Sequence, residues 1–270
     1  MQNQESQIIL EQGFTFISGS QMIIGSGMEE NSKEDLIDLQ DAFRHCISDG
    51  ENRKRAYGRY HLLPTEKGEK LKLHYGSSDY WQSASLNSEA GGNERPFAGL
   101  PSCVLENRTM IELLRLDYQL LPLDKLWKNF GKNVIEVGIH LIRMHASKDS
   151  PGVATPNYPH RDGEFFTFVH LLNRAGVVGG DSLIFSSIES NKELIRGPLL
   201  FTTTMKDPLD TLCVWDRNVF HDVTPVQLDG ASSSGVRDVI LIDFTPCESV
   251  RINKKGQPKI KRSNFNFDAA

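Results

Sequence analysis

Three side chains have the types and the order of a metal centre. His160 and Asp162 are separated by one residue in the segment YPHRDGEFF, and His221 follows in NVFHDVTPV. Two imidazoles and one carboxylate form the facial triad that holds non-haem Fe(II) and leaves three positions open for a chelating cosubstrate and O2. Alternate residues of an extended segment point to the same side, so His160 and Asp162 can reach one ion. We therefore predict that His160, Asp162 and His221 bind a metal ion.

The tripeptide His-Arg-Asp at 160–162 also matches the catalytic loop of protein kinases. That motif requires an Asn five residues after the Asp and an Asp-Phe-Gly further on. Here the first position is Thr167, and the only Asp-Phe, at 243–244, is followed by Thr. The kinase interpretation is rejected for this reason. Each histidine taken alone also fits a purely structural role, and it is the joint order of the three residues that favours a metal.

An arginine adds to this set. Arg237 begins the strand-like segment RDVILIDF, sixteen residues after His221. An arginine that turns inward from a neighbouring strand can form paired hydrogen bonds with a carboxylate. Arg237 is therefore predicted to bind a dicarboxylate cosubstrate. The alternative is an ordinary ion pair, for example with the adjacent Asp238.

The hydrophobic pattern after residue 132 predicts the elements that position these residues. Short runs rich in β-branched and aromatic residues are separated by Gly, Asp, Asn or Pro. They predict about eight antiparallel strands in a sandwich or barrel, so the fold is expected to be mainly β with flanking helices. The runs are NVIEVGIHLIRM, FFTFVHLL, DSLIFSS, LLFTTTM, DTLCVW and RDVILIDF.

The first 132 residues read as a helical and irregular part that packs on the barrel. Helical spacing of apolar residues occurs at 29–47, behind the possible N-cap Asn31-Ser32, and at 108–130, where Pro122 interrupts it. Strand-like pieces at 57–63 and 70–75 lie between the helices, before a loop rich in Gly, Pro, Asn and Ser. We predict one domain, with the N-terminal part at 1–132, the β core at 133–250 and a polar, loosely held tail at 251–270.

Composition excludes several partners. The 270-residue chain has a formal net charge of −5, so it has no basic excess for binding nucleic acid. No apolar run is long enough to cross a bilayer, and the first residues lack the pattern of a secretory signal. The four cysteines, at 46, 103, 213 and 247, form no C-x-x-C pair, which favours reduced thiols and a cytoplasmic location.

The ordered segments resemble a known family. H-x-D at 160–162 is followed by GGDSLIFSS from Gly179, FHDVTP from Phe220 and RDVILIDF from Arg237. This set resembles the 2-oxoglutarate- and Fe(II)-dependent dioxygenases that hydroxylate free amino acids, the group that contains bacterial L-isoleucine dioxygenase. Looser matches upstream extend the resemblance to roughly residues 50–246; they are AYGRY, DYWQS, GGNERPF and VGIHLIRM. The chain departs from the family at Gly163, where an acidic residue is expected, and at Leu141, where a Gln is expected, so its substrate is expected to differ.

The resemblance implies a fold and an activity. The fold is a double-stranded β-helix, the cupin-like jelly-roll. The activity is hydroxylation of a free L-amino acid, aliphatic such as Ile or Leu or otherwise Lys-like, with Fe(II), 2-oxoglutarate and O2 and with release of succinate and CO2. In these terms His160, Asp162 and His221 hold iron, and Arg237 binds 2-oxoglutarate together with the hydroxyl of Thr224.

A free amino acid carries a carboxylate and an ammonium, and each is costly to desolvate unless it is paired. Arg143 is the first candidate for the carboxylate, because it interrupts an apolar predicted strand. The other candidates are Arg59 and Arg95 for the carboxylate, Tyr57 and Gln82 as polar neighbours, and Glu164 or Glu136 for the ammonium.

Two other classes of function stay open at this point. The same iron chemistry could act on a carrier-bound or peptide residue, which would require a wide charged groove. A non-enzymatic sandwich that binds a metal or a sugar is the third possibility, and it predicts that His160→Ala leaves the main function intact.

Overall fold

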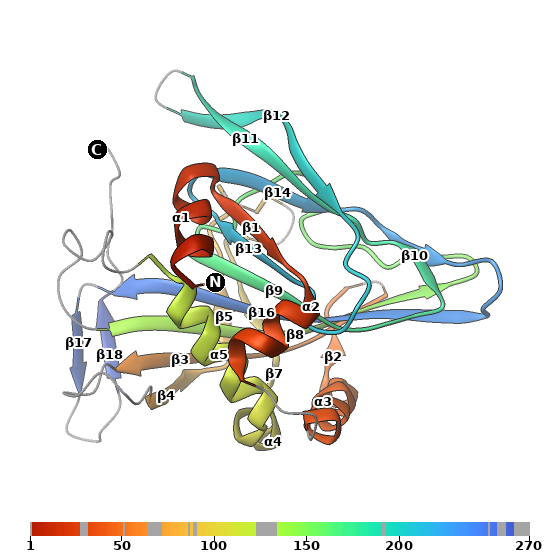
Figure 1. The fold of residues 1–270 in the computed structure, drawn as a ribbon, viewed down its shortest axis with the longest axis horizontal. Coiled ribbons are helices and arrows are strands. Elements are labelled where there is room, and N and C mark those ends of the chain that lie inside the picture. Colours follow the sequence, from red (N-terminus) through yellow and green to blue (C-terminus); the bar gives the residue numbers. More distant parts are fainter. Residues whose placement is uncertain are drawn as a thin grey trace.

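Helices cover the outer face of the larger of two β-sheets (Figure 1). Side chains of both sheets line one cavity. The computed structural model describes residues 2–27, 32–50, 52–63, 72–85, 87–88, 91–122, 134–190, 193–247, 249–252 and 258–261.

The larger sheet has the strand order β1-β13-β9-β16-β8-β3-β2, and β4 and β7 also pair with β3. All its pairs are antiparallel except β3 with β7. Its strands are β1 (Phe14–Ile17), β2 (Ile47–Ser48), β3 (Arg53–Leu63), β4 (Lys72–Ser77), β7 (Ala98–Gly99), β8 (Val134–Ser147), β9 (Phe166–Ala175), β13 (Thr211–Trp215) and β16 (Ser234–Cys247).

The smaller sheet has the order β12-β11-β14, and three separate two-stranded pairs accompany it. Its strands are β11 (Ser182–Ser190), β12 (Glu193–Thr203) and β14 (Val219–Val223). The pairs are β5 (Asp79–Trp81) with β6 (Glu94–Pro96), β10 (Val177–Gly179) with β15 (Val226–Leu228), and β17 (Ser249–Ile252) with β18 (Pro258–Lys261). The predicted mainly-β jelly-roll fold is confirmed.

The N-terminal helices pack on one face of the larger sheet. Apolar side chains of the helices form one buried cluster with side chains of β8, β9 and β16, such as Leu141, Phe168 and Ile242. The helices are α1 (Gln2–Gln12), α2 (Gly19–Ser26), α3 (Ser32–Asp41), the 3-10 helix η1 (Ala42–His45), α4 (Ser102–Glu106) and α5 (Arg108–Leu120).

Helix α5 begins and ends as its sequence requires. The Asn107 side chain caps it by accepting a hydrogen bond from the backbone N–H of Met110, and it ends at Leu120, two residues before Pro122. On its buried face Asp117 lies 2.9 Å from His170 of β9. Both side chains are fully buried, which gives His170 a structural role.

Strand alternation gives β8 and β16 two different faces. Ile139 and Leu141 of β8 face the helices, whereas His140 and Ile142 line the cavity. On β16 the cavity side carries residues 237, 239, 241 and 243. The same strands therefore build the packed core with one face and the walls of the cavity with the other.

The six predicted strand runs are all present, in β8, β9, β11, β12, β13 and β16. The predicted helix at 29–47 is α3 followed by η1, and a strand begins at Ile47. Helices α1 and α2 and strand β1 were not predicted. At the start of the predicted tail, β17 pairs with β18. Residues 253–257 and 262–270 of the tail lie outside the described residues, as do 123–130 of the second predicted helical segment. The single-domain division stays a prediction.

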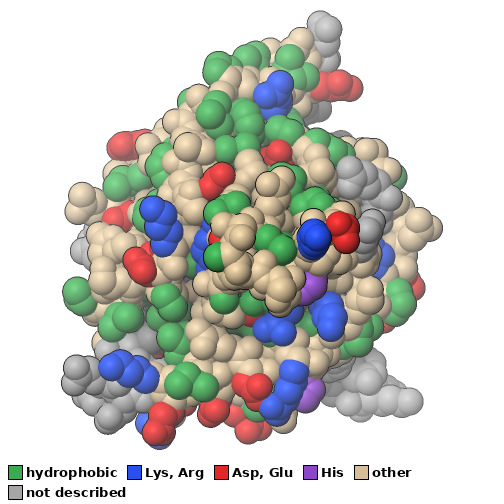
Figure 2. All heavy atoms as spheres, turned by 90° about the vertical axis from the view of Figure 1, so that its right-hand side faces the viewer, with side chains coloured by type: hydrophobic (Ala, Val, Ile, Leu, Met, Phe, Trp, Pro, Cys, Tyr) green, Lys and Arg blue, Asp and Glu red, His purple; other side chains and the backbone are tan. Residues whose placement is uncertain are grey.

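The described surface and thiols have three plain features. No helix in the described ranges is both long and apolar enough to span a membrane. Acidic and basic side chains are interspersed over the face shown in Figure 2. Cys46, Cys103 and Cys213 are free thiols.

Candidate metal centre

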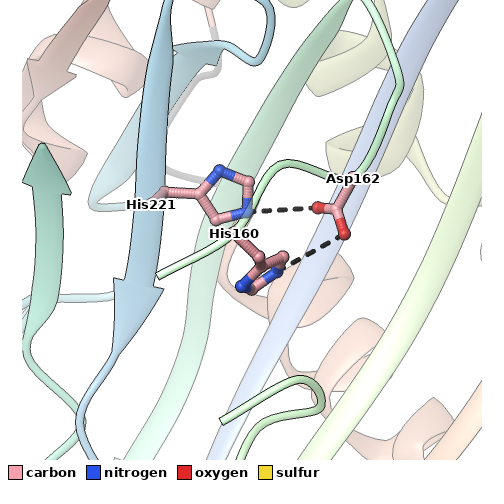
Figure 3. A group of neighbouring side chains, drawn as sticks. All are labelled: His160, Asp162 and His221. Carbon is pink, nitrogen blue, oxygen red and sulfur yellow. Dashed lines mark ion pairs between the residues drawn. The ribbon is translucent and has the colours of Figure 1, made fainter. Parts of the chain in front are cut away.

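His160, Asp162 and His221 meet on the wall of the cavity (Figure 3). Each offers one ligand atom, and these atoms lie within 4.8 Å of one another. The Nε2 atom of His160 is 3.5 Å from one carboxylate oxygen of Asp162, and Nε2 of His221 is 3.2 Å from the other. The structure thus brings together the three residues that the sequence singled out.

A backbone bridge sets the two histidines side by side. The N–H of His160 donates to the carbonyl of His221, and the N–H of His221 donates to the carbonyl of His160, both at 2.9 Å. The bridge extends the β12-β11-β14 sheet by one antiparallel position, because His221 belongs to β14. Directly opposed residues of an antiparallel pair point to the same face, so both rings reach the cavity.

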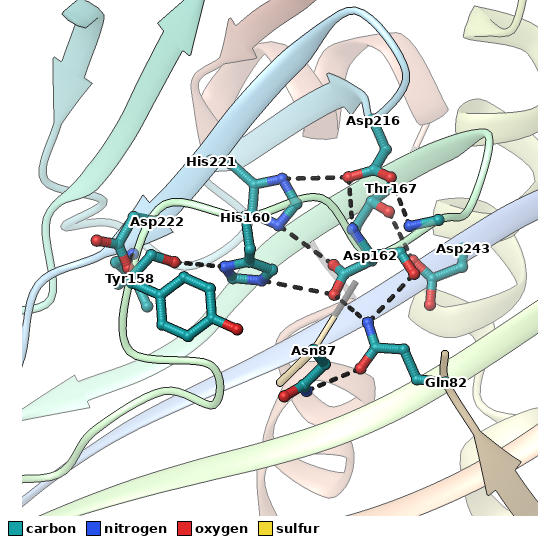
Figure 4. A network of polar contacts seen from close by, with 12 residues as sticks. Gln82, Asn87, Tyr158, His160, Asp162, Thr167, Asp216, His221, Asp222 and Asp243 are labelled. Carbon is teal, nitrogen blue, oxygen red and sulfur yellow. Dashed lines mark hydrogen bonds and ion pairs between the residues drawn. The ribbon is translucent and has the colours of Figure 1, made fainter. Parts of the chain in front are cut away.

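The outer nitrogen of each ring faces an oxygen atom, and of the two only that of His160 has hydrogen-bond geometry. His160 Nδ1 lies 2.7 Å from the carbonyl oxygen of Tyr158, and His221 Nδ1 lies 3.4 Å from the Asp216 carboxylate. Asp216 also accepts hydrogen bonds from the backbone N–H groups of Asp162 and Gly163 (Figure 4). A proton on Nδ1 leaves the lone pair of Nε2 free for a metal ion. The donor set and its support therefore fit Fe(II).

The Asp162 carboxylate is held by a third group. Gln82 Nε2 donates to the carbonyl oxygen and to Oδ1 of Asp162, both at 3.1 Å, and Asn87 donates to Gln82 Oε1 at 2.9 Å. Gln82 was predicted as a polar neighbour of the substrate. The structure places it in the cavity lining and against a candidate metal ligand, whose carboxylate it orients, and its contact with a substrate stays a prediction.

The charges of the triad suit metal binding. Burial favours the neutral acid, but hydrogen bonds with His160 and His221 outweigh it and hold the pKa of Asp162 well below its ordinary value. Burial opposes the charged form of His221, yet its contact with Asp162 raises the pKa of His221 to about 9. Without an ion, the site thus keeps a carboxylate and attracts a proton. A cation would take the place of that proton.

Arg237 lies in the cavity without a charged partner. Its side chain is 2 % exposed, and its Nε has no hydrogen bond. Among the described residues no carboxylate lies within ion-pair distance of it. Burial and the nearby Arg174 lower the pKa of Arg237 to about 10, so it remains a cation at neutral pH. A buried, unpaired guanidinium is costly, which indicates that the cavity is built to receive an anion.

A glycine makes room for Arg237. A Cβ on Gly180 would lie 2.9 Å from Arg237 Cδ, and the φ of +68° at Gly180 also favours glycine. The hydroxyl of the nearby Thr224 accepts from the N–H of Asp181 at 2.8 Å and lies 3.3 Å from the Asp181 carboxylate. Thr224 does not line the cavity. It holds the turn beside Arg237, which corrects its predicted contact with the cosubstrate.

Comparison with known proteins identifies the family. The sequence model of the 2OG-Fe dioxygenase family matches residues 43–243, a span that contains the triad and Arg237. The chain belongs to the 2OG-Fe dioxygenase family.

Relatives of this dioxygenase agree with the assignment. It is 31% identical over 243 residues to 3(1)-hydroxy-L-isoleucine 4-dioxygenase of Pantoea ananatis, covering 86% of this chain and 92% of the relative. It is also 31% identical over 203 residues to L-isoleucine-4-hydroxylase of Bacillus thuringiensis, covering 73% and 76%. The resemblance inferred from the motifs is confirmed.

Solved structures share the fold of the dioxygenase. The structure of IDO from Bacillus thuringiensis superposes with a TM-score of 0.72 at 26% identity, covering 91% of this chain and 99% of that one. A bsmA homolog from Methylobium petroleophilum gives a TM-score of 0.72 at 21% identity, covering 90% and 92%.

Arg143 does not line the cavity of this dioxygenase. Its guanidinium forms two hydrogen bonds with the Asp238 carboxylate, at 2.6 and 2.8 Å, and lies over the ring of Phe43. Odd-numbered residues of β8, such as Leu141, face the helices. Arg143, ranked first for the substrate carboxylate, is thereby removed as a candidate, because strand parity puts it on the wrong side. Leu141, expected near the pocket, lies in the core on that same side.

Four more predicted substrate residues lie outside the cavity lining. Arg59 is 3.4 Å from Glu136 and donates to the Tyr57 hydroxyl at 3.3 Å. Glu164 accepts a hydrogen bond from Thr245. These contacts replace the predicted contacts of Arg59, Tyr57, Glu136 and Glu164 with a substrate.

Arg95 does line the cavity, and so do several polar residues that sequence reasoning missed or left without a role, among them Arg53, Arg55, Tyr80, His140 and Asp243. Parity on β3, β8 and β16 could have found four of these five, because they alternate with residues of the helix-facing core.

Gln82→Leu removes both hydrogen bonds to Asp162 and should weaken metal binding about tenfold. Anaerobic titration of metal-free protein with Fe(II) measures the affinity. Gln227→Leu, on the exposed side of β15, is the control and should bind as the wild type does. Unchanged affinity of the Gln82 variant would contradict its orienting role.

Gly180→Ala should weaken binding of 2-oxoglutarate, because the added Cβ displaces Arg237. Gly230→Ala is the matched control, since Gly230 also has a positive φ, +84°, but has no atom within 4 Å of its Cβ position. Both variants should lose about 1 kcal/mol of stability from backbone strain. Only Gly180→Ala should raise the Kd of 2-oxoglutarate, measured by calorimetry on metal-loaded protein. Equal effects on that Kd would refute the steric explanation.

Proposed function

We propose that this dioxygenase hydroxylates the side chain of a free aliphatic L-amino acid, with Fe(II), 2-oxoglutarate and O2, and releases succinate and CO2. One observation carries the proposal: a His-Asp-His cluster and an unpaired buried arginine line the same cavity. The family assignment supplies the reaction type. The names of two relatives, both isoleucine-type hydroxylases, support the class of substrate.

The roles follow from the atoms that face the cavity. His160 and His221 would hold Fe(II) through Nε2, and Asp162 would hold it through its carboxylate. Tyr158 and Asp216 keep the two rings in the required orientation. The iron, when bound with 2-oxoglutarate and O2, supplies an oxidant strong enough to attack a C–H bond.

Arg237 would bind the distal carboxylate of 2-oxoglutarate. A planar guanidinium can pair both carboxylate oxygens at once, and binding would supply the counter-charge that no carboxylate of the described residues provides within ion-pair distance. This contact fixes the direction in which the cosubstrate enters the cavity. The chain's contribution to the reaction is thus to position the cosubstrate rather than to transfer a proton.

Apolar residues supply the remaining walls. They come from four strands of the larger sheet and from β14, and they exclude water from the space beside the triad. An aliphatic side chain can fill such a space without leaving a polar group unpaired, which favours an Ile- or Leu-like substrate over a Lys-like one. The residues are Ile142, Met144, Val169, Leu212, Val214, Val223, Val239 and Leu241.

Activity on a panel of L-amino acids tests the proposal. Purified protein is incubated with Fe(II), 2-oxoglutarate and O2, and both succinate and a product heavier by one oxygen atom are measured by mass spectrometry. At least one aliphatic amino acid should raise succinate above the amino-acid-free level, and His160→Ala should abolish the increase. Absence of any such increase across the panel would exclude the proposed substrate class.

Arg237→Met should raise the KM for 2-oxoglutarate at least about 30-fold, since it removes a buried charge-assisted contact. Arg237→Lys keeps the charge but loses the paired geometry, so its effect should be smaller.

Arg143→Met is the matched control, because it makes the same substitution on the neighbouring strand β8. It should leave this KM unchanged and lower the free energy of unfolding, because the fully buried Asp238 loses its bidentate partner. An unchanged KM in Arg237→Met would contradict the assigned role of Arg237.

A further inference from the structure

Three arginines surround one carboxylate at the edge of the cavity. Arg53 and Arg55 of β3 each place Nε 3.0 Å from Asp49 Oδ2, and Arg95 of β6 contacts Asp49 Oδ1. All four side chains are at most 15 % exposed. No other carboxylate in the described parts of the chain lies within ion-pair distance of these arginines. The cluster therefore retains two uncompensated positive charges.

Arg55 is the member of the cluster with unmet hydrogen-bonding capacity. Arg53 also donates to the carbonyl of Val153 and to the hydroxyl of Thr155, and Arg95 donates to Asp49. The contact of Arg55 with Asp49 is not aligned as a hydrogen bond, and its buried Nε has no hydrogen-bond partner. A guanidinium offers five N–H donors. Unlike Arg237, Arg55 has an ion-pair partner, but both are buried cations with N–H donors that no described acceptor satisfies.

The strand register gives the distance between Arg55 and Arg237. Arg55 pairs with Ile142 of β8, which pairs with Val239 of β16, two residues from Arg237. All four residues line the same cavity. Two strand spacings across and two residues along put the backbones of the two arginines about 12 Å apart. One cavity therefore presents two separate anion-binding groups, with an apolar strip between them.

Aromatic rings fix the plane of the Arg55 guanidinium. Its Cζ lies 5.1 Å from the ring centroid of Phe97 and 5.9 Å from that of Tyr80. Contact with ring faces restrains a guanidinium while leaving its N–H edge free to donate. A planar, bidentate acceptor such as a carboxylate matches that edge.

We infer that Arg55 binds the α-carboxylate of the amino acid substrate, while Arg237 binds the cosubstrate. The inference rests on the proposed function and names the group by which the substrate is recognised. The carboxylate would offset one of the two excess charges of the cluster. Ile142, next to Arg55 on the cavity wall, would then contact the aliphatic side chain as it extends toward the triad.

Recognition of the carboxylate predicts a preference for the acid over its amide. L-Isoleucine and L-isoleucinamide differ only in that group, so they are the probes. Binding of each to the anaerobic protein loaded with Fe(II) and 2-oxoglutarate is measured by calorimetry, with a panel of other L-amino acids beside them. The visible absorption of the loaded protein reports whether 2-oxoglutarate remains bound to the metal.

Arg55→Met should weaken binding of L-isoleucine about 10- to 100-fold and binding of the amide far less. Arg55→Lys should fall between Arg55→Met and the wild type. The fold should tolerate both changes, because Asp49 retains Arg53 and Arg95. Lys54→Met removes the same charge from the exposed neighbour on the same strand, and it should alter neither affinity.

Each result decides between the claims. Loss of the acid-over-amide preference in Arg55→Met, with the visible absorption intact, supports the inference. The same preference in Arg55→Met and wild type overturns it and leaves the proposed function standing. Loss of the visible absorption in Arg55→Met also overturns it, because Arg55 would then act on the metal centre. Binding of no panel amino acid by the wild type would contradict the proposed function and the inference together.

Discussion

Charge that is shielded from water is the constraint on which the cavity depends. Arg237 and Arg55 are buried and Asp162 is largely shielded from water in one mostly apolar enclosure, where a bare charge is unfavourable by several kcal/mol. The protein compensates Asp162 with two imidazoles and an amide, but it leaves the two arginines under-compensated. An enclosure with spare positive charge and apolar walls selects small anions with aliphatic parts. The under-compensated arginines and the apolar walls therefore indicate the chemistry of the ligands.

The pleat of the sheet makes this enclosure compatible with a stable core. Strand β16 alternates between Ile240 and Ile242, which pack under the helices, and Arg237 and Asp243, which line the cavity. A shift of the register by one residue would exchange the two sets and bury the charges among the helices. The long antiparallel pairing of β16 with β8, from Ser234 to Cys247, excludes that shift. The stability of the core and the identity of the lining are thus specified by the same hydrogen bonds.

The sequence predicted those strands and site residues that have a local pattern. The six strand runs have continuous β-branched composition, and His160, Asp162 and His221 have a recognisable order. It failed where a tertiary fact was needed. Strand alternation puts Arg143 and Leu141 on the same face of β8. Only the position of the helices shows that this face is turned away from the cavity. Arg53 and Arg55 went unnoticed because their strand begins in a polar stretch that reads as irregular, and Asp216 acts through backbone groups that leave no pattern in the sequence.

The backbone bridge between His160 and His221 has a consequence for how the protein assembles. It joins segments roughly sixty residues apart, and closing such a loop in the unfolded chain carries an entropic penalty that grows slowly with its length. The backbone bridge helps to offset that penalty, and it sets the two histidine ligands side by side. An ion bound across them acts as a cross-link between the segment before β9 and the edge of the smaller sheet. Folding and metal binding are therefore linked equilibria: an ion that binds only the folded chain raises the free energy of unfolding.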